Sequence, residues 1–175
     1  MNSLASTLIT ALVGFLSAIV GGFYATKTEK QVTARITFEN AYHEIFELIE
    51  NKFYDKSLSD YEIKRLGREI YSILQKSNGY YYPSLKIYAL WMFSGNYDGN
   101  LQELWFAFSS TFDKQYEQVT SLIGIPKRSR YYRINTKQYS SFSHLIKIYF
   151  FSKNGAIELL IILIGLLISL NYFIN

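Results

Sequence analysis

Two long apolar runs, one toward each end of the chain, flank a more polar middle. Residues 4–24 contain no charged side chain, and residues 157–174 contain only Glu158, near the edge of the run. A helix needs roughly 20 apolar residues to cross about 30 Å of hydrocarbon. The pattern therefore predicts transmembrane helices over 4–24 and 157–174, with a single domain over 27–153 between them.

The orientation of these spans follows from the charges. A cleaved signal peptide is the competing interpretation of the first run, but no Lys or Arg precedes the run and it is long for a signal-peptide core. All 18 Lys and Arg residues lie between Lys27 and Lys153. By the positive-inside rule, the middle domain is expected in the cytoplasm and both termini outside the inner (plasma) membrane.

The first apolar run also contains a stripe of small or hydroxylated residues. They recur at alternating intervals of four and three: Ser3, Thr7, Thr10, Gly14, Ser17 and Gly21. This period places them on one face of a helix. Lipid offers their hydroxyl groups no partner, whereas another helix or water does. We expect this face to pack within an assembly or to line a pore.

Two partners for the stripe remain open. The second apolar run has its own small residues, Gly165 and Ser169, on a matching stripe. Packing of the two spans within one chain is the simpler interpretation. Self-association of the first span into a homo-oligomer, with or without a water-filled pore, is the other.

The middle of the chain reads as helices. Between Phe23 and Phe53 there is neither Gly nor Pro and the apolar residues keep a helical period, so the first span is expected to continue as one long helix. Ser59 and Glu62 form a capping box that opens the next helix, and an Asn-Gly pair at 78–79 ends it.

Three further helices complete the expected domain. Pro83 suits the first turn of a short helix that stops at Gly95, and Asn100 opens a long helix with a regular apolar stripe. A last amphipathic helix is expected over about 141–152. The predicted class is all-α, with N- and C-terminal transmembrane helices flanking a cytoplasmic domain of four to five helices.

Composition argues against catalysis. The chain has no cysteine and two histidines, and neither His43 nor His144 lies in a metal-binding motif, so no metal or cofactor is expected. Phosphate-binding loops and nucleophile motifs are absent, and the acidic residues are scattered along helix faces. We expect both histidines to be structural and the protein not to be an enzyme.

The least generic feature is a basic, acid-free stretch near the end of the domain. No Asp or Glu occurs from Gln118 through Ile157, whereas seven basic residues do: Lys127, Arg128, Arg130, Arg133, Lys137, Lys147 and Lys153. Tyr131 and Tyr132 interleave with the first of these cations, in a segment expected to be a loop. Cations beside aromatic rings are typical of sites for nucleotides or single-stranded oligonucleotides.

Anionic lipid headgroups are the alternative partner for these cations. For Lys147 and Lys153, close to the second span, lipid is the preferred interpretation. For the segment from Lys127 to Lys137, a phosphate-bearing ligand and a lipid or solvated surface are both kept. A second Tyr-rich stretch, residues 80–82, is a candidate extension of the same platform.

The plan of a first span, a cytosolic helical domain and a basic aromatic segment resembles the small membrane effectors of bacterial anti-phage systems. Some members of that group are channels controlled by nucleotide or oligonucleotide ligands. The resemblance implies an oligomeric channel or membrane-disrupting effector, gated from its cytoplasmic domain. The alternative is a non-conducting, membrane-anchored binding protein such as a phage exclusion or immunity factor. The abundance of Tyr, Phe, Asn, Ile and Lys is typical of an AT-rich bacterial or phage genome.

Overall fold

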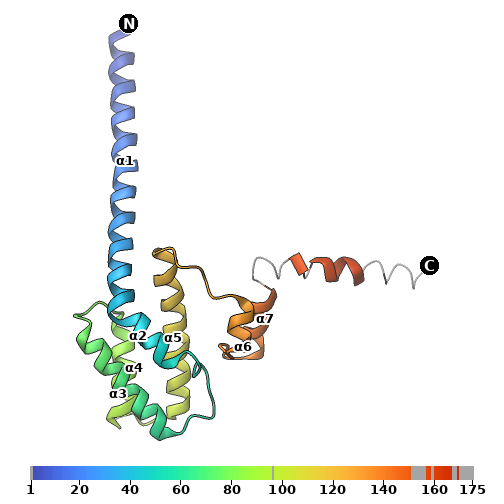
Figure 1. The fold of residues 1–175 in the computed structure, drawn as a ribbon. Helices are drawn as coiled ribbons and strands as arrows, with labels where there is room; N and C mark the ends of the chain where they lie inside the picture. Colours follow the sequence, from blue (N-terminus) through green and yellow to red (C-terminus); the bar gives the residue numbers. More distant parts are fainter. Residues whose placement is uncertain (1, 96, 151–156, 159, 167–168, 170–175) are drawn as a thin grey trace.

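The computed structural model describes residues 2–95, 97–150, 157–158, 160–166 and 169, and among these residues the regular structure is entirely helical (Figure 1). In chain order the elements are α1 (Asn2–Thr37), η1 (Phe38–Tyr42), α2 (His43–Ile49), α3 (Asp60–Lys76), α4 (Pro83–Ser94), α5 (Leu101–Leu122), α6 (Arg130–Asn135) and α7 (Phe142–Phe150). The all-α prediction is confirmed.

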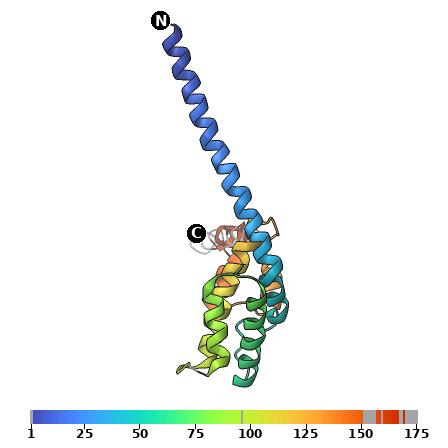
Figure 2. The same ribbon diagram turned by 90° about the vertical axis from the view of Figure 1, so that its left-hand side faces the viewer.

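The first three elements form one continuous helical rod, as the absence of Gly and Pro predicted. α1 projects from the helical domain, and only its C-terminal end joins the core (Figures 1 and 2). Burial begins at Ala34. The rod then passes through η1, a π-helical turn. This turn carries Ala41 and Tyr42, both fully buried, into the domain.

α3 and α4 pack against each other as a pair, and their boundaries follow the predicted signals. Ser59 and Glu62 make the reciprocal capping box at the start of α3. Pro83 occupies the first turn of α4, and Gly95 ends it at φ 74°. The two helices cross closely at Gly67, where a Cβ atom would lie 2.6 Å from the Cβ of Met92. Only glycine fits this crossing without displacing α4.

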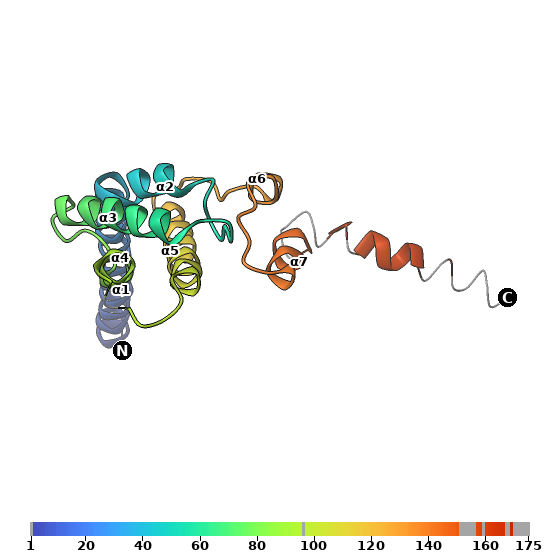
Figure 3. The ribbon, with the colours of Figure 1, turned by 90° about the horizontal axis from the view of Figure 1, so that it is seen from below.

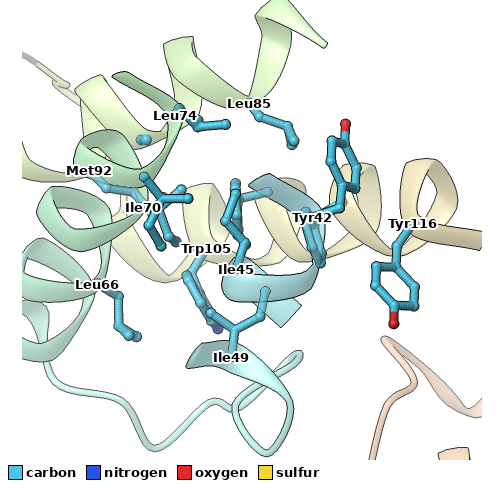
Figure 4. Packing of buried hydrophobic residues seen from close by; sticks show 14 of the residues in the cluster. Tyr42, Ile45, Ile49, Leu66, Ile70, Leu74, Leu85, Met92, Trp105 and Tyr116 are labelled. Atoms are coloured by element: carbon cyan, nitrogen blue, oxygen red, sulfur yellow. The ribbon is translucent and has the colours of Figure 1, made fainter. Parts of the chain in front are cut away.

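α5 supplies the aromatic side of the core (Figure 4). Trp105, Phe108 and Phe112 are fully buried on one face of α5. Phe112 stacks on Tyr42 with ring centroids 5.3 Å apart, and the Trp105 Nε1 donates a hydrogen bond to the carbonyl of Lys52 at 3.0 Å. Branched aliphatic residues of α2 and α3 fill the space opposite these rings.

α6 and α7 lie beside the helical bundle (Figure 3). The prediction of a loop at 127–133 is wrong in part, because residues from Arg130 onward form α6, capped by Ser129. The described residues between 157 and 166 are helical and exposed, apart from the half-exposed Glu158. Residues 159, 167–168 and 170–174 of the predicted second span, and Lys153, lie outside the described residues.

Candidate functional site

The projecting part of α1 is the first candidate site. Within the described residues, one helix is long and apolar enough to cross a membrane, and it is the helix that begins with α1; the apolar stretch is not buried against the rest of the chain. Beyond the apolar stretch the helix continues through a polar segment, residues 26–35, which we call the neck of α1. Thr26 and Thr28 each donate a hydrogen bond to the carbonyl four residues back, at 2.8 and 3.0 Å.

The predicted stripe of small residues lies on this projecting part of the rod. Thr7, Thr10, Gly14, Ser17 and Gly21 are all exposed. A Cβ added at Gly14 or at Gly21 would meet no atom within 4 Å. The side chain of Ser3 is outside the described part of the chain.

The second apolar run does not cover this stripe in the part of the chain that the structure describes. A Cβ at Gly165 would also meet nothing within 4 Å, and Ser169 is exposed. The expected packing of the two spans against each other is therefore not seen between the residues described. Among the residues that the structure describes, Gly14 and Gly21 on this face of α1 have open space beside them.

The second candidate site is the basic segment, and here the structure gives the arginines internal partners. The Arg128 side chain is only 9% exposed. Its Nε donates to Glu117 at 2.7 Å and its Nη1 to Gln138 at 2.7 Å, while Nη2 pairs with Asp113. Burial alone would lower the pKa of Arg128, but the Asp113 and Glu117 carboxylates raise it above its ordinary value.

Aromatic rings enclose the same guanidinium group. Its central carbon lies 5.1 Å from the ring centroid of Tyr116, 5.4 Å from that of Phe46 and 5.7 Å from that of Phe53. Cations over ring faces are attracted by the ring quadrupole. The pairing of cations with aromatic rings that the sequence suggested is real, but for Arg128 it is built inside the protein.

Asp113 is the centre of this network. Its side chain is 8% exposed and pairs with both Arg128 and Arg133. The Tyr54 hydroxyl donates to the same carboxylate at 3.3 Å. Burial and the neighbouring Asp113 charge both raise the pKa of Tyr54, so the phenol stays protonated and can donate.

Glu50, at the end of the helical rod, contacts α6 and the residues that follow it. Its carboxylate accepts a hydrogen bond from the Tyr132 hydroxyl, and its backbone carbonyl accepts one from Gln138 Nε2 at 3.0 Å. Burial and the hydrogen bond to the Glu50 carboxylate raise the pKa of Tyr132 to about 12. We call the set of Glu50, Tyr54, Asp113, Glu117, Arg128, Tyr132, Arg133 and Gln138 the α6 clamp.

Arg130 is not part of the α6 clamp; it links α6 to the second apolar run. It forms an ion pair with Glu158. Its guanidinium carbon lies 4.8 Å from the Tyr131 ring centroid and 4.9 Å from that of Tyr149 on α7. The single charge of the second apolar run thus has a cationic partner in α6.

Few of the predicted ligand-binding residues remain turned outward. Lys127, Tyr131 and Lys137 are exposed, as is Lys147 on α7. Lys137 lines a cleft of about 630 Å³ between residues 51–57 and residues 135–142.

The tyrosines at 80–82 lie elsewhere. They line a groove of about 730 Å³ against the neck of α1 and the end of α5, together with Lys30 and Thr33. The structure therefore does not bring this stretch and Lys137 into one cleft, contrary to the expected shared platform.

The two histidines lie in different parts of the fold, His43 at the start of α2 and His144 on α7. His43 is exposed, 3.5 Å from Glu47, and stacks on the Phe38 ring. The Nδ1 of His144 accepts a hydrogen bond from the backbone N–H of Ser140 at 3.2 Å. Burial, followed by the charge of Arg133, lowers the pKa of His144. The described residues contain no group of acidic or histidine side chains able to hold a metal ion.

Sequence reasoning missed the α6 clamp, although a signal for it was present. Asp113 and Glu117 are four residues apart, within a helix that has a regular apolar stripe. The acid-free, arginine-rich stretch follows them in the sequence. Acidic residues on the core-facing side of a helix are usually paired, and nearby arginines are the expected partners.

Comparisons with known proteins assign no relative. No family model matches the chain, no curated protein matches it, and no solved structure matches it.

Proposed function

We propose that this protein is an oligomeric membrane channel or membrane-disrupting effector, assembled through the small-residue stripe of α1. One observation carries the proposal: the stripe is exposed along the projecting helix, and Gly14 and Gly21 have open space where a neighbouring helix would approach. In a bilayer, close packing of small residues is a main source of helix association. A second copy of the same face is the partner of matching shape.

The proposed topology has two spans, residues 4–24 and 157–174, with the helical domain in the cytoplasm and both termini outside. The Arg130–Glu158 ion pair supports the second span, because it neutralises the one charge of that run where the run begins. The exposed Lys147 is then placed to meet lipid headgroups. Lys153 has the same proposed role.

Regulation by a nucleotide or single-stranded oligonucleotide is the next part of the proposal. The cleft beside Lys137 also presents Lys56, Tyr139 and the strongly exposed Phe142. Two cations and two rings suit a phosphate and a base, respectively. Arg128 and Arg133 of the α6 clamp are not part of the proposed ligand site, because they already form ion pairs with carboxylates of the protein.

Such a ligand acts only if it binds one state of the assembly more tightly than the other. The rod offers a route between the two sites, because α1 continues through η1 into the core beside the clamp. π-helical turns are frequent at functional positions in helices. The architectural resemblance to bacterial anti-phage effectors supports a role in defence.

The proposal is tested with the purified full chain in liposomes. We expect release of entrapped ions, and we expect Thr10→Leu and Gly14→Leu to change it because bulky side chains disturb the stripe. Phe15→Leu is the matched control, an exposed residue off the stripe. Liposomes that stay tight with and without ATP or single-stranded DNA would contradict the proposal.

The ligand part has its own test. Binding of fluorescent ATP or single-stranded DNA to the solubilised chain is measured for the wild type and for Lys137→Glu. Lys76→Glu, an exposed lysine at the end of α3, is the control. Equal binding by both variants would show that the cleft is not the site.

An exposed apolar face on α4 favours a second candidate, a non-conducting membrane-anchored binding protein. Ile87, Leu90 and Trp91 are each more than 40% exposed, at helical spacing. Exposed apolar patches of this kind mark interaction surfaces. In this case Leu90→Glu would abolish binding of the partner to the α4 face, and Gly14→Leu would leave this binding intact.

A further inference from the structure

We propose that the turn after α5, residues 122–127, inserts into the membrane interface and contacts anionic lipid. We call it the interfacial turn. The inference rests on the proposed membrane embedding of α1 and assigns a lipid-binding role to a part of the helical domain.

The position of the turn is the first observation. A groove of about 790 Å³ separates α1 from the end of α5, and it is lined by Ala18, Ile19 and Gly22 on one side and by Leu122 and Gly124 on the other. The upper end of α5 reaches up alongside α1 (Figure 1). The groove also reaches Thr26, Lys27 and Lys30 on α1, so if α1 spans the membrane over residues 4–24, the turn lies at the boundary between hydrocarbon and headgroups. At about 1.5 Å per residue, Gly22 lies roughly 3 Å inside that boundary.

The chemistry of the turn suits this depth. The side chains of Leu122 and Ile125 are 38% and 37% exposed. No acidic residue occurs between Glu117 and Glu158, and Lys127 follows directly on the apolar tip. Apolar side chains next to cations are the composition that binds the headgroup region of an anionic bilayer.

The backbone N–H groups at the apolar tip of the turn have hydrogen-bond partners within the protein. The N–H groups of Ile123, Gly124 and Ile125 donate to the carbonyls of Val119, Ser121 and Thr120, at 3.3, 3.4 and 2.9 Å. Pro126 has no N–H group to satisfy. An apolar turn with unpaired N–H groups would resist insertion, since an N–H group without a partner is strongly unfavourable in hydrocarbon. The N–H groups of Ile123, Gly124 and Ile125 carry no such penalty.

Two more cations complete the surface. Lys27 and Lys30 line the same groove from the neck of α1. Lys127, at the end of the interfacial turn, is exposed as well. Both α1 and the turn thus carry positive charge near the level proposed for the lipid phosphates. A bilayer is the occupant that meets both the apolar tip and the cations at one depth.

The absence of cysteine from the chain permits a direct test with single labelled positions. The variants Ile125→Cys, Phe15→Cys and Tyr61→Cys each carry one environment-sensitive dye. The full chain is reconstituted in vesicles of phosphatidylcholine and phosphatidylglycerol that contain lipids spin-labelled near the glycerol or near the methyl end of the acyl chain. Tyr61 is the matched control, an exposed ring at the start of α3.

We expect the dye at 15 to be quenched by the deep spin label and the dye at 125 by the shallow one, with a blue shift. The dye at 61 should be quenched by neither. Quenching at 15 with no more quenching at 125 than at 61 would overturn the inference and leave the proposed span standing. Lack of quenching at 15 would overturn both.

Replacing phosphatidylglycerol by phosphatidylcholine tests the charge. We expect shallow quenching at 125 to fall, and Lys127→Glu should lower it in anionic vesicles as well. Quenching that is unchanged in both arms would refute the contact with anionic lipid.

Discussion

Removing the charge of Asp113 is the most informative perturbation of the domain. The α6 clamp holds two cations, Arg128 and Arg133, against two carboxylates, Asp113 and Glu117. Asp113→Asn keeps the shape of the side chain but leaves one positive charge uncompensated. The exposed fractions of Asp113, Arg128 and Arg133 are 8%, 9% and 14%, so solvent screens this charge poorly.

The expected cost follows from this geometry. Breaking a buried ion pair by removing one partner destabilises by roughly 3–5 kcal/mol. Arg128 keeps Glu117, so the loss falls mainly on Arg133, which retains the Gln138 carbonyl at 3.4 Å. We therefore expect the lower end, about 3 kcal/mol. A domain with a typical 5–15 kcal/mol of stability would still fold.

Urea unfolding of the full chain in detergent measures this cost, with the fluorescence of the buried Trp105 as the signal. At a typical dependence of about 1–3 kcal/mol per molar urea, the midpoint should fall by roughly 1–3 M. Trypsin should also cleave faster within α6, because the clamp holds that helix to the bundle.

Two comparisons make the reasoning refutable. Asp98→Asn, at an exposed position, should change the free energy of unfolding by less than about 0.5 kcal/mol. Adding Arg133→Gln to Asp113→Asn removes the unpaired charge, so the double substitution should cost less than the sum of the two. Additive costs, or an Asp113→Asn effect no larger than that of Asp98→Asn, would refute the clamp.

Three further predictions concern stability measured in the same way. Gly67→Ala should cost about 1–3 kcal/mol, since its Cβ would lie 2.6 Å from that of Met92; no loss would mean that α3 and α4 do not cross closely there. Ser59→Ala should cost about 1 kcal/mol by removing the cap of α3, and an unchanged midpoint would contradict the capping box. The lowered pKa of His144 means that the unfolded chain binds a proton more readily. The free energy of unfolding should therefore fall as pH drops below about 6.5, and His144→Gln should reduce that fall.

Local signals predicted the helices well because each boundary depends on residues close in sequence. The Ser59 cap, Pro83 and the left-handed Gly95 act within one turn of the helix that they start or stop. The core stripe of α5 was equally readable, since its period is a property of one segment. The rod from α1 to α2 followed from the absence of breakers.

The binding partners of the arginines could not be predicted from local sequence signals. A basic, tyrosine-rich segment looks the same in sequence whether its charges face a ligand or an internal carboxylate. Arg128 and Asp113 are 15 residues apart, and Tyr132 and Glu50 are 82 apart, so only the packed fold brings them together. The π-helical turn at 38–42 likewise follows from packing, because no residue there demands it by propensity.

Self-association through α1 is the central claim, and the mass of the detergent-solubilised chain tests it most directly. Light scattering with the detergent contribution subtracted should give a protein mass several times the 20.4 kDa of one chain. Gly14→Leu should reduce that mass, and Phe15→Leu should leave it unchanged. A wild-type mass of one chain would contradict the assembly and, with it, the pore.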